Sequence, residues 1–497
     1  MRNLSKLAHP YCNCLTAIRM STSQPQASDD SDEAILSDYY AWTGLLRAGL
    51  AILSRVGYVL IQVGSVPISN VNLILLQNAV DVCWVTVMYL VFGTFVSHNV
   101  HVKGVVERGR WFGHEDIDRE EAIIGWTAVI ISSAICTSAI VGRTHTVGYL
   151  VIGLLLSAVV QPLLIHWTWS RDGFFKKNAL SSESDDYRDY AGASVVHLTG
   201  GLSGLIGCMV LGRRILRLRD IDDASISPSS SVTVFAGHLM VFIGLQVFLN
   251  ELSSKGKAFL QMLPFQSLSI PNGETERMSV LVAGLSRVYL NNLLAAASCC
   301  LCVVFLHFIP SREAFNHWTV MRCVQATVSG LVIVSAGSNA YRPSIAIVLG
   351  CVGGTIFFLI SRIVFHRALE DNCNIVATYL ACTIFGSILA PLCAFKSGTN
   401  TNTFFFGLLW QLLCLLMASA LTIIIMTSAF IALEFCGILR NRSEHLNHAR
   451  AVVALRRAPR RTCFKRIFLP DSNSVYLQPG SLSKSGQQPN NHTPAMK

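Results

Sequence analysis

The chain has 497 residues, of which 52% are hydrophobic and only 14% are charged. A soluble globule of this length needs more charged side chains to cover its surface, so the composition argues against one and indicates a polytopic membrane protein. The net charge of +10 comes from basic residues gathered in loops and one C-terminal stretch. We attribute it to the positive-inside rule rather than to nucleic-acid binding.

The first 37 residues combine basic side chains with a polar, acidic run, SQPQASDDSDE. No apolar core of seven or more residues follows the early basic residues, so we predict no cleaved signal peptide. The first membrane span is therefore expected to direct insertion.

Eleven apolar runs bounded by charged or Pro/Gly-rich breaks predict transmembrane helices, since a helix needs about 20 apolar residues to cross a bilayer. An odd number of spans places the termini on opposite sides. Two basic segments are expected in the cytoplasm: the stretch after the last span, and the loop GRRILRLRD with its arginines. With the C-terminus in the cytoplasm, the N-terminus is expected outside. The predicted spans are 40–65, 72–97, 121–142, 146–168, 189–212, 232–252, 283–309, 320–337, 343–365, 373–395 and 403–437.

Some polar side chains fall inside predicted spans, where a bilayer resists them. The charged ones are Arg47, Arg55, Asp81 and Arg287. For each, an ion pair or a position at the membrane interface is the simpler explanation, with a functional role as the alternative. The adjacent amides Asn291 and Asn292 are expected to hydrogen-bond between helices.

Sixteen cysteines would suit a disulfide framework, but several lie in apolar runs, where cysteine acts as a small hydrophobe. We therefore predict free thiols. The CC-x-C run lacks a nearby histidine or carboxylate, so packing is favoured over a metal site. We predict no metal, no cofactor and no enzymatic activity, since the acidic cluster in FGHEDIDREE is explained as a solvated turn.

The stretch DYAGASVVHLTGGLSG places one histidine, His197, in an uncharged run of small residues behind Asp189. On a helix, Ala193, His197, Gly200 and Gly204 share one face. Small residues there either let a neighbouring helix approach closely or leave room for a narrow passage. A neutral imidazole in a bilayer demands hydrogen-bond partners, which makes His197 a functional candidate, with a packing histidine as the alternative.

The longer stretch DYAGASVVHLTGGLSGLIGCMVLGRR resembles the fifth-helix signature of the ammonium transporter family, the Amt/Mep/Rh group. The likeness continues, in the family order, in GYVLIQVGSVPISNVNLILLQNAVDVC, HWTWSRDG, VYLNNLLAAAS and VQATVSGLVIVSAGSNAYRPSIAIVLGCVGG. It implies an all-α polytopic membrane protein with eleven transmembrane helices, an inverted repeat of five helices, and a homotrimer. It also implies that ammonium binds at an outer site and crosses as ammonia along a histidine-lined hydrophobic path.

The resemblance assigns roles to single positions. Trp169 matches the outer cation-binding tryptophan, Asp189 the signature aspartate, and His197 the first pore histidine. Phe248 in VFIGLQVFLN resembles the gate phenylalanine of the sixth helix, and Ser253 is expected near the hydroxyl of the outer site.

Three positions depart from the family pattern. Tyr379 falls where the second pore histidine is expected, Asn374 where an acid is usual, and Ile124 where the other gate phenylalanine belongs. A phenol with a pKa of about 10 is a poor proton relay at neutral pH. Tyr379 is therefore either a hydrogen-bonding partner of His197 or an aromatic plug between helices.

Two functions remain open. One is transport of ammonium, ammonia or methylammonium through a pore in each protomer, in the plasma membrane with the N-terminus outside and the C-terminus cytoplasmic. The other is a poorly conducting ammonium sensor or regulatory subunit. The expected partners are the lipid bilayer and further copies in a homotrimer, not nucleic acid. We expect an extracellular segment over 1–38, the transmembrane domain over 39–437, and a basic, largely disordered cytoplasmic tail over 438–497.

Overall fold

The computed structural model describes residues 26–66, 71–97, 119–170, 173–176, 178–180, 186–212, 231–248, 272–309, 317–366, 369–394 and 401–441. By its internal contacts the chain divides into two compact units, Met1–Gly49 and Leu50–Lys497. The described part of the first unit is the beginning of helix α2, and the other helices lie in the second unit.

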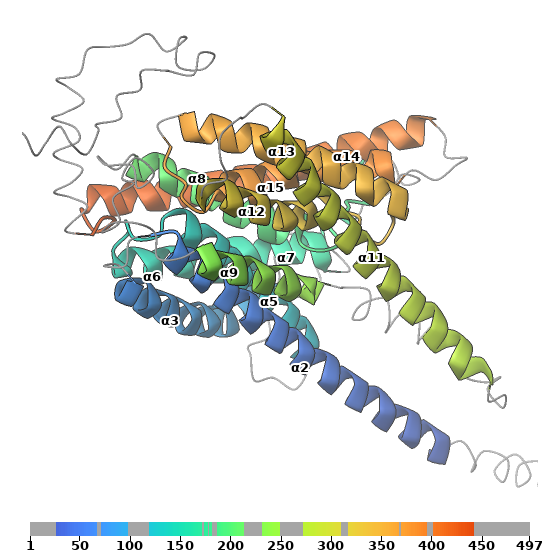
Figure 1. Cartoon of the computed structure of the whole chain (residues 1–497). Helices are drawn as coiled ribbons and strands as arrows, with labels where there is room; N and C mark the ends of the chain where they lie inside the picture. Colours follow the sequence, from blue (N-terminus) through green and yellow to red (C-terminus); the bar gives the residue numbers. More distant parts are fainter. Residues whose placement is uncertain are drawn as a thin grey trace, which may run out of the picture. The chain divides into compact units, whose positions relative to one another are not determined.

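Within the described ranges the secondary structure is helical, apart from turns and one isolated bridge between Thr144 and Arg440. A helix satisfies its backbone N–H and C=O groups internally, which an apolar chain requires where no water is available. The elements of the first half (Figure 1) are α2 (Gln26–Gly64), α3 (Val71–Met88), η2 (Tyr89–Gly93), α4 (Thr94–Ser97), α5 (Arg119–Ala139), α6 (Thr146–Leu155), η3 (Leu156–Val160), α7 (Gln161–Trp169), η4 (Ala193–Leu198) and α8 (Thr199–Leu211).

The second half continues the same architecture. η8 and η4 are π-helical segments that each lead directly into an α-helix, and such segments occur frequently at functional sites. The elements are α9 (Ser231–Gly244), η5 (Leu245–Phe248), α11 (Asn272–Phe308), α12 (His317–Val334), α13 (Pro343–His366), η8 (Val376–Ala381), α14 (Cys382–Cys393) and α15 (Thr401–Phe435).

Each predicted span corresponds to a helical stretch in the described part of the chain. There, nine helices are long and apolar enough to cross a membrane, and Ser231–Val247 and Thr319–Val334 are shorter apolar helices. Two helices begin earlier than their apolar runs, α2 at Gln26 rather than 40 and α11 at Asn272 rather than 283. Polar residues that favour helix, such as glutamate, extend both helices beyond the apolar run.

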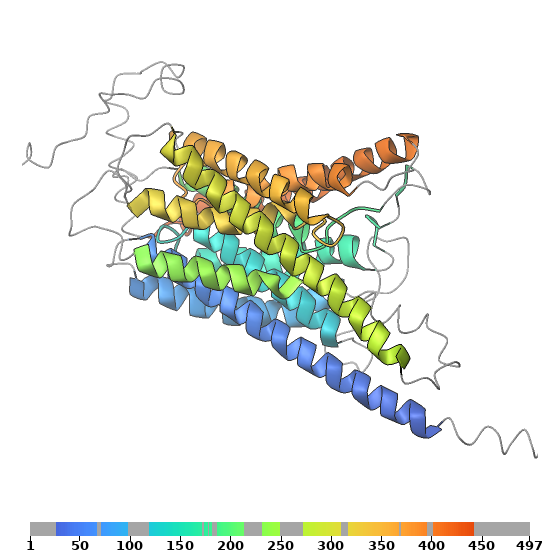
Figure 2. The same cartoon turned by 45° about the vertical axis from the view of Figure 1, so that its right-hand side comes forward.

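The helices of the second unit pack closely at small residues. α8 packs against α5 and α15, and α11 packs against α12 and α13 (Figures 1 and 2). Where α2 meets α9, a Cβ on Gly57 would lie 2.6 Å from the Gly237 carbonyl oxygen, and one on Gly237 would lie 2.7 Å from that of Gly57. Glycine at both positions therefore permits this close approach of the two backbones.

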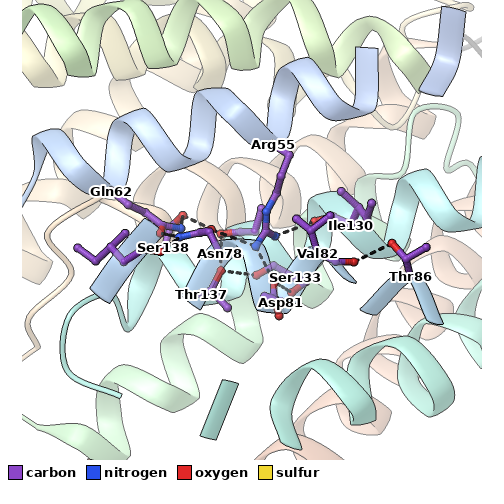
Figure 3. Close-up of polar contacts among 12 residues, drawn as sticks. Arg55, Gln62, Asn78, Asp81, Val82, Thr86, Ile130, Ser133, Thr137 and Ser138 are labelled. Carbon is purple, nitrogen blue, oxygen red and sulfur yellow. Dashed lines mark hydrogen bonds and ion pairs between the residues drawn. The ribbon is translucent and has the colours of Figure 1, made fainter. Parts of the chain in front are cut away.

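A polar network joins α2, α3 and α5 inside the bundle (Figure 3). Arg55 donates to Asp81 Oδ2 at 2.5 Å and to Asn78 Oδ1 at 3.0 Å. Asn78 donates to Gln62 Oε1 at 2.7 Å, and Gln62 donates to the Ser138 hydroxyl at 2.9 Å. The sequence-based prediction of a paired charge is thus confirmed for Arg55 and Asp81.

The two adjacent amides of α11 bond between segments, as predicted. Asn291 Nδ2 donates to the carbonyl oxygens of Ser338 and Tyr341, at 2.8 and 3.0 Å. Asn292 Nδ2 donates to Gln246 Oε1 at 2.7 Å. These bonds connect α11 to the turn after α12 and to η5.

The cysteines in the apolar runs pack as small side chains. Cys299, Cys382 and Cys414 are fully buried, and each cysteine in the described part of the chain is a free thiol. The described residues include no group of three or more histidine, cysteine or acidic side chains placed to hold a metal ion.

Candidate functional site

Asp189 lies in the turn before η4 and caps this helical segment. Its Oδ2 accepts hydrogen bonds from the Ser194 hydroxyl at 2.8 Å and from the Val195 backbone N–H at 3.2 Å. A carboxylate is favourable here because the first N–H groups of a helix carry partial positive charge. Burial nevertheless raises the pKa of the Asp189 carboxyl to about 6, against the lowering effect of these hydrogen bonds.

Trp169, the last residue of α7, is bonded to this same turn. Its indole N–H donates to the Asp189 backbone carbonyl at 3.2 Å. Its ring lies against Gly192, where an added Cβ would come within 3.6 Å of Trp169 Cζ2. The structure thus brings Trp169 and Asp189 together at the start of the segment that carries His197.

The other residues expected around the outer site are less completely placed. Phe248 is the last residue of η5, and its side chain lies outside the described part of the structure. Ser253 lies outside the described residues altogether. Ile124 is half-buried on α5. Next to it, a Cβ on Gly125 would collide with the Tyr89 hydroxyl. An aromatic ring from η2 therefore lies against α5 at Gly125.

The small residues of α8 serve close helix packing, which was one of the two explanations of the motif. A Cβ on Gly200 would lie 2.9 Å from the Ser132 carbonyl oxygen, and one on Gly204 would lie 2.7 Å from the Ala139 Cβ, both on α5. His197 lies outside α8 itself. It belongs to the π-helical segment, whose different winding breaks the regular α-helical spacing between His197 and the glycines.

The ring of His197 lies beside that of Tyr379. Their centroids are 5.7 Å apart and their planes differ by 31°. His197 comes from η4 and Tyr379 from η8, and each residue is only 3% exposed. The structure therefore brings together the two positions expected to face each other in the path.

Tyr58 of α2 is a third ring at this place, which the sequence reading missed. Its hydroxyl donates to the Tyr379 hydroxyl at 2.7 Å, and the two ring centroids are 6.1 Å apart. Tyr58 is 1% exposed. The sequence did contain a sign of this position. Tyr58 shares one face of the helix with Arg55 and Gln62, and polar side chains within a membrane span indicate a face that points into the protein.

The two π-helical segments repeat one local pattern. Asp371 stands eight residues before Tyr379, as Asp189 stands eight residues before His197. Asp371 Oδ2 accepts the Val376 backbone N–H at 2.7 Å, and so caps η8 as Asp189 caps η4. A repeat between the two halves of the chain is thus visible in the local chemistry of single residues.

Asn374 lies in the turn before η8 and has a left-handed backbone conformation. Its φ of 52° corresponds to the 76° of Gly192, and each of these two residues stands five positions before its ring. Asparagine tolerates this left-handed conformation better than most residues. Asn374 also donates to Gln325 Oε1 at 2.6 Å. Asp371, eight residues before Tyr379, is the acid that corresponds by spacing to Asp189.

Comparison with known proteins agrees with this geometry. The model of the Ammonium Transporter Family matches residues 41–449. The protein named "Putative ammonium transporter 1" of Caenorhabditis elegans is 24% identical in an alignment of 409 residues that covers 78% of this chain and 72% of that protein. The protein named "Ammonium transporter 1 member 2" of Oryza sativa subsp. japonica is 25% identical over 67% of this chain and 66% of its own length.

Solved structures show the same fold. The structure titled "Sensor Amt Protein" superposes with a TM-score of 0.68 at 19% identity, over 83% of this chain and 97% of its own. Saccharomyces cerevisiae Mep2 superposes with a TM-score of 0.62 at 18% identity, over 82% of this chain and 87% of its own. At such low sequence identities, the likeness to these structures shows the fold alone. The match to the family model, in contrast, is a sequence match that includes η4 and η8. The chain belongs to the ammonium transporter family.

Proposed function

We propose that the protein binds ammonium or methylammonium beside Trp169 and Asp189 and conducts ammonia along a path lined by His197 and Tyr379. Family membership and the names of the relatives support ammonium as the substrate. A neutral molecule crosses an apolar path at far lower cost than an ion, which favours passage as ammonia. The imidazole of His197 can both donate and accept hydrogen bonds to it.

One observation carries this proposal: the hydrogen bond between the Trp169 indole and the Asp189 carbonyl. It fixes an aromatic face and a buried acid as a single unit at the start of the segment that carries His197. An aromatic face attracts a cation, and a nearby carboxylate lowers the free energy of that cation. The same unit thus collects the cation and stands next to the path.

The proposal extends to assembly and location. It places the protein in the plasma membrane, with the N-terminus outside and the C-terminus in the cytoplasm, as a homotrimer with one path in each protomer. The basic residues after the last span support this orientation. The apolar helices support a protein that crosses the membrane several times.

Growth complementation tests the proposed function. A yeast strain without ammonium transporters of its own is expected to grow on low ammonium when it produces this protein. A Trp169→Leu variant at equal surface amount is expected to grow less well. Absence of growth with the wild-type protein at the cell surface would rule out transport under these conditions.

The hydrogen bond between Tyr58 and Tyr379 favours a second candidate, a poorly conducting ammonium sensor. In this case ammonium binds beside Trp169 and Asp189, but little passes the buried tyrosine pair. Uptake of radiolabelled methylammonium in a heterologous cell separates the two candidates. Uptake by wild type supports the transporter, whereas no uptake together with ammonium binding to the purified protein supports the sensor. Tyr379→His is expected to raise methylammonium uptake in either case.

A further inference from the structure

Three rings from three segments form a continuous row inside the bundle. Tyr379 lies between His197, at 5.7 Å, and Tyr58, at 6.1 Å, measured between ring centroids. The two tyrosine hydroxyls are joined by a hydrogen bond of 2.7 Å. This bond connects α2 in the first half of the chain to η8 in the second half, and so reaches across from one half of the repeat to the other.

The row leaves no room for a small molecule beside it. Tyr58 is 1% exposed, and Tyr379 and His197 are 3% exposed, so a water-sized probe hardly reaches any of the three. Ammonia is about as large as water. It can therefore pass this level only after a ring has moved.

The backbone of α2 around Tyr58 is fixed by contacts of the neighbouring residues. Three residues before it, Arg55 bonds to Asp81, and four residues after it, Gln62 bonds to Ser138. The neighbouring Gly57 fixes α2 closely against α9. The helix that carries Tyr58 is thus anchored on several sides, and the movable parts at this level are the side chains.

We propose that Tyr58 is a gate residue, and that its hydrogen bond to Tyr379 closes the ammonia path next to His197. This inference rests on the proposed path but assigns a residue and a step that the path alone does not contain. For each passage the two hydroxyls separate, and a tyrosine ring turns aside. The entering ammonia offers a replacement partner to the Tyr379 hydroxyl, which limits the cost of opening.

The gate has a direct kinetic consequence. Tyr58→Phe keeps the ring but removes the hydroxyl, so the closed arrangement loses its hydrogen bond. Net contributions of single hydrogen bonds correspond to about a 3- to 10-fold change in an equilibrium. Maximal methylammonium uptake is therefore expected to rise about 3- to 10-fold, with an unchanged KM, because Trp169 and Asp189 are untouched. Tyr58→Leu, which also removes the ring, is expected to raise uptake at least as much.

The experiment measures radiolabelled methylammonium uptake at equal surface amounts of wild type, Tyr58→Phe, Tyr58→Leu and Tyr149→Phe. Tyr149 of α6 is the matched control, since it is also a fully buried tyrosine, but its hydroxyl has no hydrogen-bond partner among the described residues. The double variant Tyr58→Phe, Tyr379→Phe is expected to be no faster than Tyr58→Phe, because both changes remove the same bond.

The outcomes separate this inference from the proposed function. Conduction by the Tyr58 variants but not by wild type would confirm the gate and contradict transport by the wild-type protein. Conduction by wild type with equal or slower uptake by both Tyr58 variants would overturn the gate and leave transport in place. Silence of wild type and of both variants at the surface would contradict both.

Discussion

Arg55 of α2 and Asp81 of α3 form an ion pair inside the bundle, with side chains only 5% and 0% exposed. Ser133 of α5 also donates to Asp81 Oδ2, at 2.7 Å. Removing one member of a buried pair leaves the other charge uncompensated, and this costs more than the pair itself contributes. The pair and Ser133 together join α2, α3 and α5.

Breaking this pair is expected to destabilise the protein. Asp81→Ala should lower the free energy of unfolding by about 3–5 kcal/mol, whereas Arg55→Met together with Asp81→Leu should recover most of the loss. Thermal unfolding of the detergent-solubilised protein measures this. Arg287→Gln on α11 is the control, because Arg287 is exposed. Equal losses in the single and the double variant would contradict the prediction.

Removing the aromatic face of Trp169 is expected to weaken cation binding. A cation–π contact of about 0.5–2 kcal/mol corresponds to about a 2- to 30-fold rise in the methylammonium KM of Trp169→Leu. Uptake at varied methylammonium concentration measures KM and maximal rate separately. Trp84→Leu is the matched control, since Trp84 also donates to a backbone carbonyl, that of Leu150, at 2.8 Å. A similar KM change in both variants would argue against a binding role.

Substrate affinity is expected to depend on pH through Asp189. Burial raises its pKa from 3.8 to about 6, so the carboxylate is charged above this pH and neutral below it. The charged form attracts the cation, and methylammonium stays protonated throughout. The methylammonium KM should therefore rise as the pH falls from about 7 to about 5, across this pKa. Asp189→Asn should show a high KM with little change over this range. An equally steep dependence in the variant would assign it to another group.

Gly201 of α8 is expected to tolerate no side chain. An added Cβ would lie 2.8 Å from the Leu380 backbone nitrogen and 3.1 Å from its Cα, so η8 and its Tyr379 would have to shift. Gly201→Ala should therefore cost about 1–3 kcal/mol of stability and change uptake. Gly49→Ala is the control, because nothing lies within 4 Å of its added Cβ. A Gly201→Ala protein as stable as wild type would contradict the close contact.

The membrane helices were predictable from the sequence because each is marked by an apolar run long enough to cross a bilayer. Such a run can be recognised in one segment without knowing how the segments pack. Their starts were less predictable, since helix propensity continues α2 and α11 into polar sequence. The buried charges Arg55 and Asp81 were predictable in kind, because a charge inside a bilayer needs a partner. Their identity as partners depends on how α2 and α3 pack, which no local pattern encodes.

The ring row shows the same limit more clearly. Tyr58 and Tyr379 are 321 positions apart, so no spacing connects them. The backbone role of Asn374 was not predictable either, because only the structure shows its positive φ. Asp371, in contrast, could have been found from the sequence, since the eight-residue distance from Asp189 to His197 recurs before Tyr379.

The repeated capped segments have a chemical consequence. Each half supplies an acid, a left-handed residue and a ring in the same order, but one ring is an imidazole and the other a phenol. An imidazole can donate one hydrogen bond and accept another through two separate nitrogens, whereas a phenol does both through a single oxygen. Two segments that share a scaffold thus present chemically unequal rings to the same place in the bundle.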